Sequence, residues 1–396
     1  MKKQKVLIVG GGFGGLKAAL NLAGDERFEV TLLSERADFR YYPTLYHTAT
    51  GAKASNASIP LAHLFAGKPV HFVQGVASSI DRRAKTITTA DGQTLGFDSL
   101  ILALGVITNY FGIKGLEEYA YGIKSAEEVS RFKTHVHQQL TDERKPDLNY
   151  IIVGAGPTGI ELAGSLGRYL KHIMKLHGIE HRAIHIDLIE ASPRLLPRMP
   201  RDTSRMITRQ LKRLGVKIYT GQAVQGETAD ELILNGKPIR SHTVIWTAGM
   251  TNSPFFKANN FALNARGKVY VDTYLQSDPD IFVIGDNANT PYSGMAQTAL
   301  YDGDFVAENL KRQASGKDMK SYNAKQPITV IPAGDHWAAV LWGKVRLYGW
   351  VGWFLREAGD LKGFLDYESL PDATKQWATE FISEESCPVC LQANIY

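Results

Sequence analysis

The chain has few cysteines, no long apolar run and no concentrated charge, and each shortage excludes a class of protein. Two cysteines in 396 residues cannot form the framework of a disulfide-rich extracellular protein. No uncharged apolar stretch reaches the roughly 18 residues of a membrane-spanning helix. The formal net charge is only +5 and no basic run occurs, so nucleic-acid binding is not expected. No signal peptide precedes the first apolar run, and we expect a protein of the reducing cytoplasm or of the cytoplasmic face of the membrane.

Glycine is abundant, with 37 residues, and two sets of glycines repeat one pattern. In each set a short apolar run, typical of a buried parallel strand, leads into the spacing G-x-G-x-x-G. The first glycine permits a tight turn, the second admits a pyrophosphate, and the third lets the following helix pack on the strand. The pattern therefore predicts two dinucleotide sites, one at Gly10, Gly12 and Gly15, the other at Gly154, Gly156 and Gly159.

An acidic residue follows each glycine set at the end of the next predicted strand. Glu35 lies 20 residues after Gly15, and Glu190 lies 31 residues after Gly159 because the intervening helix and loop are longer. A carboxylate at this place binds ribose hydroxyls and repels a 2′-phosphate, so Glu190 favours NADH over NADPH, although the nearby Arg194 softens that preference. A glycine-rich turn in an unrelated α/β domain would explain one copy, but not both copies with both carboxylates.

The order of the predicted elements indicates an α/β fold with two interleaved Rossmann-like dinucleotide-binding domains. Apolar strands at 98–105 and 243–249 each end in a glycine, and the chain then returns to the first domain near 281–286. We expect a first nucleotide-binding domain interrupted by the second, followed by a region of different composition. The expected boundaries are 1–120 and 251–325, 121–250, and 326–396.

Several stretches resemble the type II NADH dehydrogenases, which are NADH:quinone oxidoreductases that carry FAD. These stretches are 9–16, 102–109, 154–164, 245–249, 281–286 and 295–299. The glycine motifs are shared by a whole flavoprotein superfamily, whereas the Ala-Gln-Thr-Ala sequence at 296–299 is more specific. The resemblance is clear over about residues 5–315. In the C-terminal part only the general composition is similar. It implies oxidation of NADH through FAD and two-electron reduction of a membrane quinone in a respiratory chain, without proton pumping.

The resemblance assigns FAD to the first glycine set, with Glu35 on the adenosine ribose. NADH falls to the second set, where Gly249 ends the companion strand. Asp286 is placed beside the ribityl chain of the flavin, since Gly285 permits a close approach and an aspartate accepts hydrogen bonds from hydroxyls. Asp286 also suits a helix N-cap, and the two roles are compatible. No metal site is expected.

Three residues are expected at the electron acceptor. The resembled family has an Ala-Gln pair and a second glutamine near the quinone; here Gln297 is present, and Tyr301 stands at the second position. A tyrosine hydroxyl also bonds a quinone carbonyl, so the change bears on which acceptor binds more than on whether a site exists. Glu161 matches a family glutamate near the flavin and is a candidate proton relay to the quinone. The alternative is a carboxylate that only suits the helix dipole.

Residues 336–367 hold four of the six tryptophans. A helix read from Val345 places one set of side chains on a single stripe: Leu347, Trp350, Val351, Phe354, Leu355 and Leu361. The charged residues Arg346, Arg356, Glu357 and Asp360 fall largely elsewhere. This amphipathic pattern is typical of a helix that lies on a membrane surface. The alternatives are a helix packed on the flavin domain or across a homodimer, and the balanced charge shows no attraction to anionic lipid.

The sequence Cys387-Pro-Val-Cys390 near the C-terminus leaves other functions open. A C-x-x-C pair serves as a redox pair, as half of a zinc site, or as two reduced thiols without a role. Zinc would need ligands from a partner, because no second pair occurs. The alternatives to a quinone reductase are a flavoprotein reductase of a soluble or disulfide acceptor that uses this pair, and a flavin-based redox sensor.

Overall fold

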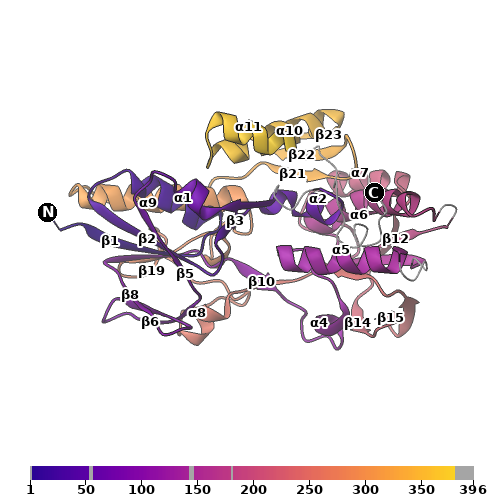
Figure 1. The fold of residues 1–396 in the computed structure, drawn as a ribbon, viewed down its shortest axis with the longest axis horizontal. Helices are drawn as coiled ribbons and strands as arrows, with labels where there is room; N and C mark the ends of the chain where they lie inside the picture. Colours follow the sequence, from indigo (N-terminus) through magenta and orange to yellow (C-terminus); the bar gives the residue numbers. More distant parts are fainter. Residues whose placement is uncertain (1, 53–56, 142–146, 180–181, 380–396) are drawn as a thin grey trace.

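The computed structural model describes residues 2–52, 57–141, 147–179 and 182–379. The molecule is elongated, with one parallel sheet in each half and a C-terminal layer along one long face (Figure 1). The α/β architecture predicted from the sequence is confirmed.

The first half is built on a six-stranded sheet in the order β19-β20-β9-β1-β2-β5. Strand β1 is central and pairs in parallel with β2 and β9. Its last four residues are fully buried, as the apolar run predicts. Helices α1 (Phe13–Ala23) and α9 (Ala296–Ala314) pack against each other beside this sheet. The strands are β1 Gln4–Val9, β2 Phe28–Ser34, β5 Val70–Gln74, β9 Ser99–Leu102, β19 Gln276–Asp278 and β20 Ile281–Val283.

The second half is built on a parallel four-stranded sheet in the order β13-β12-β11-β17. Its strands are β11 Asn149–Val153, β12 His185–Glu190, β13 Lys217–Thr220 and β17 Val244–Trp246. The helices of this half are α5 Ala126–Thr141, α6 Pro157–Leu176 and α7 Arg201–Arg213. Since β19 and β20 follow this sheet in the sequence, the chain leaves the first sheet and later returns to it.

Smaller elements complete the two halves. Strands β10 (Val106–Thr108) and β18 (Met250–Asn252) form an antiparallel pair where the chain passes between the halves. The other small sheets contain β3 Asp38–Arg40, β4 Ser58–Pro60, β6 Ala77–Asp81, β7 Thr86–Thr89, β8 Thr94–Gly96, β14 Val224–Glu227, β15 Glu231–Leu234 and β16 Lys237–Arg240. The short helices are η1 Tyr42–Thr44, α2 Leu45–Ala49, α3 Leu61–Leu64, α4 Leu116–Tyr119, α8 Pro254–Ala258 and η3 Gly285–Asn287.

The C-terminal layer departs from the sequence-based expectation. The helix read from Val345 begins only at Trp350, and residues 345–349 are strand β23. Gly343, with φ of +59°, turns the chain so that β23 pairs antiparallel with β22, and Gly349, with φ of +81°, ends the strand before the helix. The elements of this layer are β21 Thr329–Pro332, β22 Ala338–Trp342, β23 Val345–Gly349, α10 Trp350–Leu365 and α11 Leu370–Thr379.

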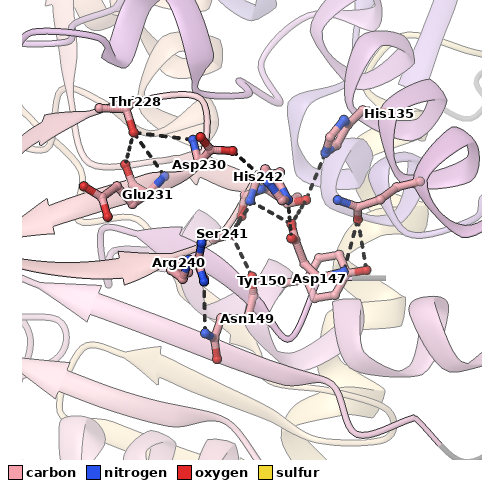
Figure 2. Close-up of polar contacts among 12 residues, drawn as sticks. His135, Asp147, Asn149, Tyr150, Thr228, Asp230, Glu231, Arg240, Ser241 and His242 are labelled. Atoms are coloured by element: carbon pink, nitrogen blue, oxygen red, sulfur yellow. Dashed lines mark hydrogen bonds and ion pairs between the residues drawn. The ribbon is translucent and has the colours of Figure 1, made fainter. Parts of the chain in front are cut away.

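A buried carboxylate joins the amino ends of two strands of the second sheet (Figure 2). Asp147 precedes β11 and accepts hydrogen bonds from the backbone N–H of His242 at 2.9 Å and from the Thr243 hydroxyl at 2.7 Å. It also lies 2.8 Å from Nδ1 of His242, just before β17, while His135 contacts Thr243. In open α/β sheets ligands bind at the opposite, carboxyl ends of the strands, so we interpret this network as structural.

Candidate functional site

The first glycine set has the geometry that each of its three positions requires. Gly10 has φ of +112°, and a Cβ atom placed there would lie 2.2 Å from the carbonyl oxygen of Ala103. A Cβ on Gly15 would lie 2.0 Å from the carbonyl oxygen of Gly10, so α1 packs too closely on the turn for a side chain. A Cβ on Gly12 would meet nothing within 4 Å. The helix therefore begins beside open space, where its N–H groups can meet a phosphate.

The second glycine set repeats this division of roles. Gly154 has φ of +104°, and its Cβ would lie 2.7 Å from Cα of Ala248. A Cβ on Gly159 would lie 1.9 Å from the carbonyl oxygen of Gly154, whereas one on Gly156 would meet nothing within 4 Å. Gly249 lies past the end of the neighbouring β17, and a Cβ there would come 2.3 Å from the Asn109 carbonyl oxygen. Both sets thus have two glycines that packing requires and one that leaves room for a ligand.

The two carboxylates that follow the glycine sets lie in different surroundings. Glu190 reaches back to its own glycine loop, where its carboxylate accepts hydrogen bonds from the N–H groups of Ala155 at 2.9 Å and Ser192 at 2.7 Å. Glu35 is exposed at the end of β2 and lines an open cavity of about 640 Å³. Arg36, Asp38, Arg40 and Ser125 line the same cavity. An open cavity beside a carboxylate that is predicted to bind a ribose is the place expected for an adenosine.

Asp286 lies in η3, at the carboxyl end of β20. Burial raises the pKa of its carboxyl, although the positive charges of Lys268 and Lys124 oppose this. The Nζ atom of Lys124 is buried, and it has no hydrogen-bond partner within the described ranges. Burial lowers the pKa of Lys124 to about 8, against the attraction of Glu128 and Asp286. A buried ammonium without an acceptor is costly, so Lys124 indicates an anionic or carbonyl ligand next to Asp286.

Lys124 was missed by the sequence analysis, and so was a second carboxylate behind Asp286. Asp302 of α9 is fully buried, accepts a hydrogen bond from the N–H of Gly285 at 3.0 Å, and accepts another from the Tyr322 hydroxyl at 2.6 Å. Burial raises the pKa of Asp302 to about 6, although these two hydrogen bonds oppose the rise. Asp302 therefore fixes the turn that carries Asp286. No local pattern marks either residue in the sequence.

Gln297 and Tyr301 lie one turn apart on α9, and both face the segment before β21. The Gln297 side chain accepts a hydrogen bond from the N–H of Ile328 at 3.0 Å and donates one to its carbonyl oxygen at 3.0 Å. The ammonium of Lys325 lies 4.1 Å from the ring centroid of Tyr301. Gln297 thus ties the C-terminal layer to α9 with both polar atoms of its amide. No hydrogen bond or ion pair among the described residues links this pair to Glu161.

Glu161 instead belongs to a polar cluster beneath α10. Arg356 of α10 donates a hydrogen bond to Nε2 of His47 at 3.1 Å and lies 3.0 Å from Asp360. Burial raises the pKa of Glu161 to about 7; Arg356 opposes this rise and Asp360 adds to it. Burial, Arg356 and Arg168 lower the pKa of His47 to about 3, so its ring is neutral and its Nε2 accepts. Glu161 is therefore a carboxyl that can take up and release a proton near neutral pH.

Helix α10 has its charged side inward and its aromatic side outward. Arg356, Glu357 and Asp360 are buried. Trp350 and Phe354 are 65% and 58% exposed, and their rings stack with centroids 6.2 Å apart. In an ordinary surface helix the apolar side faces the core, so this arrangement marks the outer face as a contact surface.

Three further expectations concern the cysteine pair, a metal site and membrane-spanning helices. Cys387 and Cys390 lie outside the described residues. Within the described ranges, no group of three or more His, Cys, Asp or Glu side chains is placed to hold a metal ion. Every helix in the same ranges is too short or too polar to cross a bilayer.

A family model and two curated relatives match most of the chain. Residues 4–303 match the family model described as pyridine nucleotide-disulphide oxidoreductase. Proteins named type II NADH:quinone oxidoreductase from Staphylococcus saprophyticus and Staphylococcus aureus are each 27% identical to the chain, and each match covers 84% of it and 88% of the relative.

Two solved structures share the fold. NDH2 from Plasmodium falciparum in complex with NADH superposes with a TM-score of 0.85 at 17% identity, over 96% of this chain and 98% of that one. The sulfide:quinone oxidoreductase of Aquifex aeolicus superposes with a TM-score of 0.78 at 22% identity, over 91% and 90% of the two chains.

Proposed function

Because the chain belongs to the pyridine nucleotide-disulphide oxidoreductase family, we propose that it oxidises NADH through FAD and reduces a membrane quinone. The resemblance to the type II NADH:quinone oxidoreductases predicted from the sequence is confirmed by the curated relatives of that name. The observation that carries the proposal is the pair of glycine sets, each with one position open toward a ligand. One site holds the electron carrier and the other holds the electron donor.

The residues of the first site fit FAD. Gly12 leaves room for the pyrophosphate, and Glu35 lines a cavity suited to the adenosine. Asp286 would accept hydrogen bonds from the ribityl hydroxyls, and the buried Nζ of Lys124, which has no partner among the described residues, would donate one to an oxygen of the cofactor. Bound FAD would supply the hydride and electron chemistry, which no side chain of the protein provides.

The residues of the second site fit NADH. Gly156 leaves room for the pyrophosphate, and the N-terminus of α6 faces it. The Glu190 carboxylate, held by the N–H groups of Ala155 and Ser192, is placed for the adenosine ribose and would repel a 2′-phosphate. The guanidinium of Arg194 donates to the carbonyls of Leu196, Pro197 and Met199, so it is already engaged. We infer that the protein prefers NADH to NADPH.

We assign the acceptor side to Glu161, Gln297 and Tyr301. Quinone reduction consumes two protons, and Glu161, with a pKa of about 7, can deliver one of them. Gln297 holds Ile328, and Tyr301 contacts Lys325, so these two residues would shape the wall of the site. The domain division proposed with these roles is 1–120 with 251–325 for FAD, 121–250 for NADH and 326–396 for membrane contact.

The outward aromatic side of α10 supports a peripheral position on the membrane, and we propose the cytoplasmic face. Burying an aromatic side chain of this kind stabilises by about 1.5–3 kcal/mol, so a few of them suffice to hold the protein on a bilayer. The variant Trp350→Ser/Phe354→Ser should lose vesicle binding. The matched control Val76→Ser/Tyr270→Ser removes two side chains that are 47% and 54% exposed elsewhere and should keep it. Equal losses in both variants would argue against the α10 surface.

A rate measurement tests the reaction. The purified protein, loaded with FAD, should oxidise NADH rapidly only when a short-chain quinone is added, and NADPH should be a poor substitute. Rapid NADH oxidation with a disulfide acceptor and none with quinone would overturn the proposal in favour of a disulfide reductase. Replacement of Cys387 and Cys390 by serine should leave the quinone rate unchanged. Flavin reduction by NADH that is slow even at saturation would favour the redox sensor.

A further inference from the structure

We propose that helix α7 selects membranes with anionic headgroups and acts together with the aromatic surface of the C-terminal layer. This inference rests on the peripheral membrane position proposed above and adds a charge-reading element from the NADH-binding half. The arginine ladder is defined as Arg201, Arg205, Arg209 and Arg213. The aromatic patch is defined as Trp342, Val345, Trp350, Val351 and Phe354.

The arginine ladder places a positive charge at every fourth residue of α7. All four side chains are exposed, whereas Thr203, Ser204, Ile207 and Leu211 form the buried side of the helix. With Lys212 the helix carries five cations against one acid, Asp202, which gives a charge of +4. None of the four arginines forms an ion pair with a carboxylate within the described ranges.

Helix stability does not account for the arginine ladder. Like charges four residues apart repel each other and destabilise a helix. A row of such repulsions, without acidic partners, is suited to a surface that supplies negative charge from outside the protein. The ladder therefore points to an external anionic partner.

Contacts tie α7 to β23, whose first residue, Val345, belongs to the aromatic patch. Asp202 pairs with Arg346 of β23, and the Thr203 hydroxyl lies 2.9 Å from the Tyr348 hydroxyl. Farther along the helix, Gln210 donates to the carbonyl oxygen of Ala333 at 3.3 Å, next to the end of β21. The helix thus contacts the C-terminal layer in both its first and its last turn. Arg209 follows Asp202 by seven residues, which is nearly two turns, so it lies on the flank that borders β23.

The aromatic patch offers the apolar half of a bilayer contact. Trp342 is 60% and Val345 is 53% exposed at the tip of the β22–β23 hairpin, and the exposed Lys344 lies between them. The acidic residues of α10, Glu357 and Asp360, are buried on its inner side and present no negative charge to a membrane. Apolar insertion and basic charge side by side are the two signals that together give stable, lipid-selective anchoring.

Vesicle sedimentation with the FAD-loaded, full-length protein tests the inference. The wild type should bind vesicles of phosphatidylcholine with one-third phosphatidylglycerol at least about tenfold more tightly than pure phosphatidylcholine, because each surface cation adds attraction. The preference should shrink as salt rises. The variant Arg205→Gln/Arg209→Gln/Arg213→Gln should lose the preference while keeping the weaker binding to pure phosphatidylcholine.

A charge-matched control separates α7 from net charge. The variant Arg83→Gln/Lys237→Gln/Lys257→Gln removes three exposed cations from other elements and should keep the anionic preference. An equal loss in both triple variants, or a wild type without any preference, would overturn the role of α7. NADH oxidation with a soluble quinone in detergent should be unchanged in the α7 variant. If the wild type lacks NADH oxidation with quinone but keeps the lipid preference, the proposed reaction is refuted and α7 remains a membrane contact.

Discussion

The substitution Glu161→Gln should raise stability at high pH and lower quinone reduction. In the folded protein burial raises the pKa of Glu161 from its ordinary 4.5 to about 7. Between these pH values the native state holds a proton that the unfolded chain has released, so the free energy of unfolding falls as pH rises through this window. The rise in pKa corresponds to about 3 kcal/mol. Because glutamine cannot ionise, the variant should escape this loss.

Urea unfolding at pH 5 and pH 8 measures the effect. The stability gain of the variant over the wild type should be small at pH 5 and grow to about 3 kcal/mol at pH 8. Quinone-dependent turnover should fall by about a hundredfold and lose its inflection near pH 7, since general acid catalysis contributes at least this much. Reduction of the bound flavin by NADH should be unaffected. A stability gain of the same size at both pH values would contradict the raised pKa of the Glu161 carboxyl.

A second glutamate with a raised pKa provides the matched control. Burial raises the pKa of Glu227 in β14 to about 8, against the attraction of Arg131. Glu227→Gln should therefore gain stability at alkaline pH in the same way, yet leave quinone turnover unchanged. If both variants lose turnover equally, the loss follows from altered packing, and the proton role of Glu161 is wrong.

Four further substitutions test the cofactor site and the second sheet. Gly15→Ala should destabilise by about 1–3 kcal/mol or more through overpacking, whereas Gly12→Ala should fold normally and lose FAD, as flavin fluorescence after gel filtration would report. Lys124→Met should raise the melting temperature of the FAD-free protein and weaken FAD binding at least about tenfold, because it removes a buried charge that only the ligand satisfies; tighter FAD binding would contradict this. Burial lowers the pKa of His242, but its hydrogen bonds to Asp147 and Asp230, together with their negative charges, raise this pKa overall. The charged ring therefore stabilises the folded protein below pH 6.5, and this stabilisation is lost as pH rises through the folded pKa. His242→Gln should lower the melting temperature at pH 6 more than at pH 9.

Local patterns predicted the two nucleotide sites because their requirements are local. The positive φ of Gly10 and the close packing of Gly15 on the Gly10 carbonyl are both decided within a strand, a turn and one helix, and the same holds for Gly154 and Gly159. The later return of the chain to the first sheet was also expected, from the apolar run at 281–286, and strand β20 pairs there with β9. The surroundings of Asp286 were not expected from the sequence. Asp302 and Lys124 come from other helices and turns, and no spacing rule connects them to Asp286.

The C-terminal layer shows where periodicity alone misleads. The residues from Val345 to Gly349 fit a helical stripe, but pairing with β22 and the turn at Gly343 make them a strand. In α10 the pattern correctly separates aromatic from charged residues, yet it cannot say which side faces inward. That choice depends on partners far away in the sequence, since His47 and Glu161 give Arg356 a polar interior to enter. The outer side of α10 is left apolar as a result, and in the proposed function this side would meet the membrane while Glu161 acts beneath it.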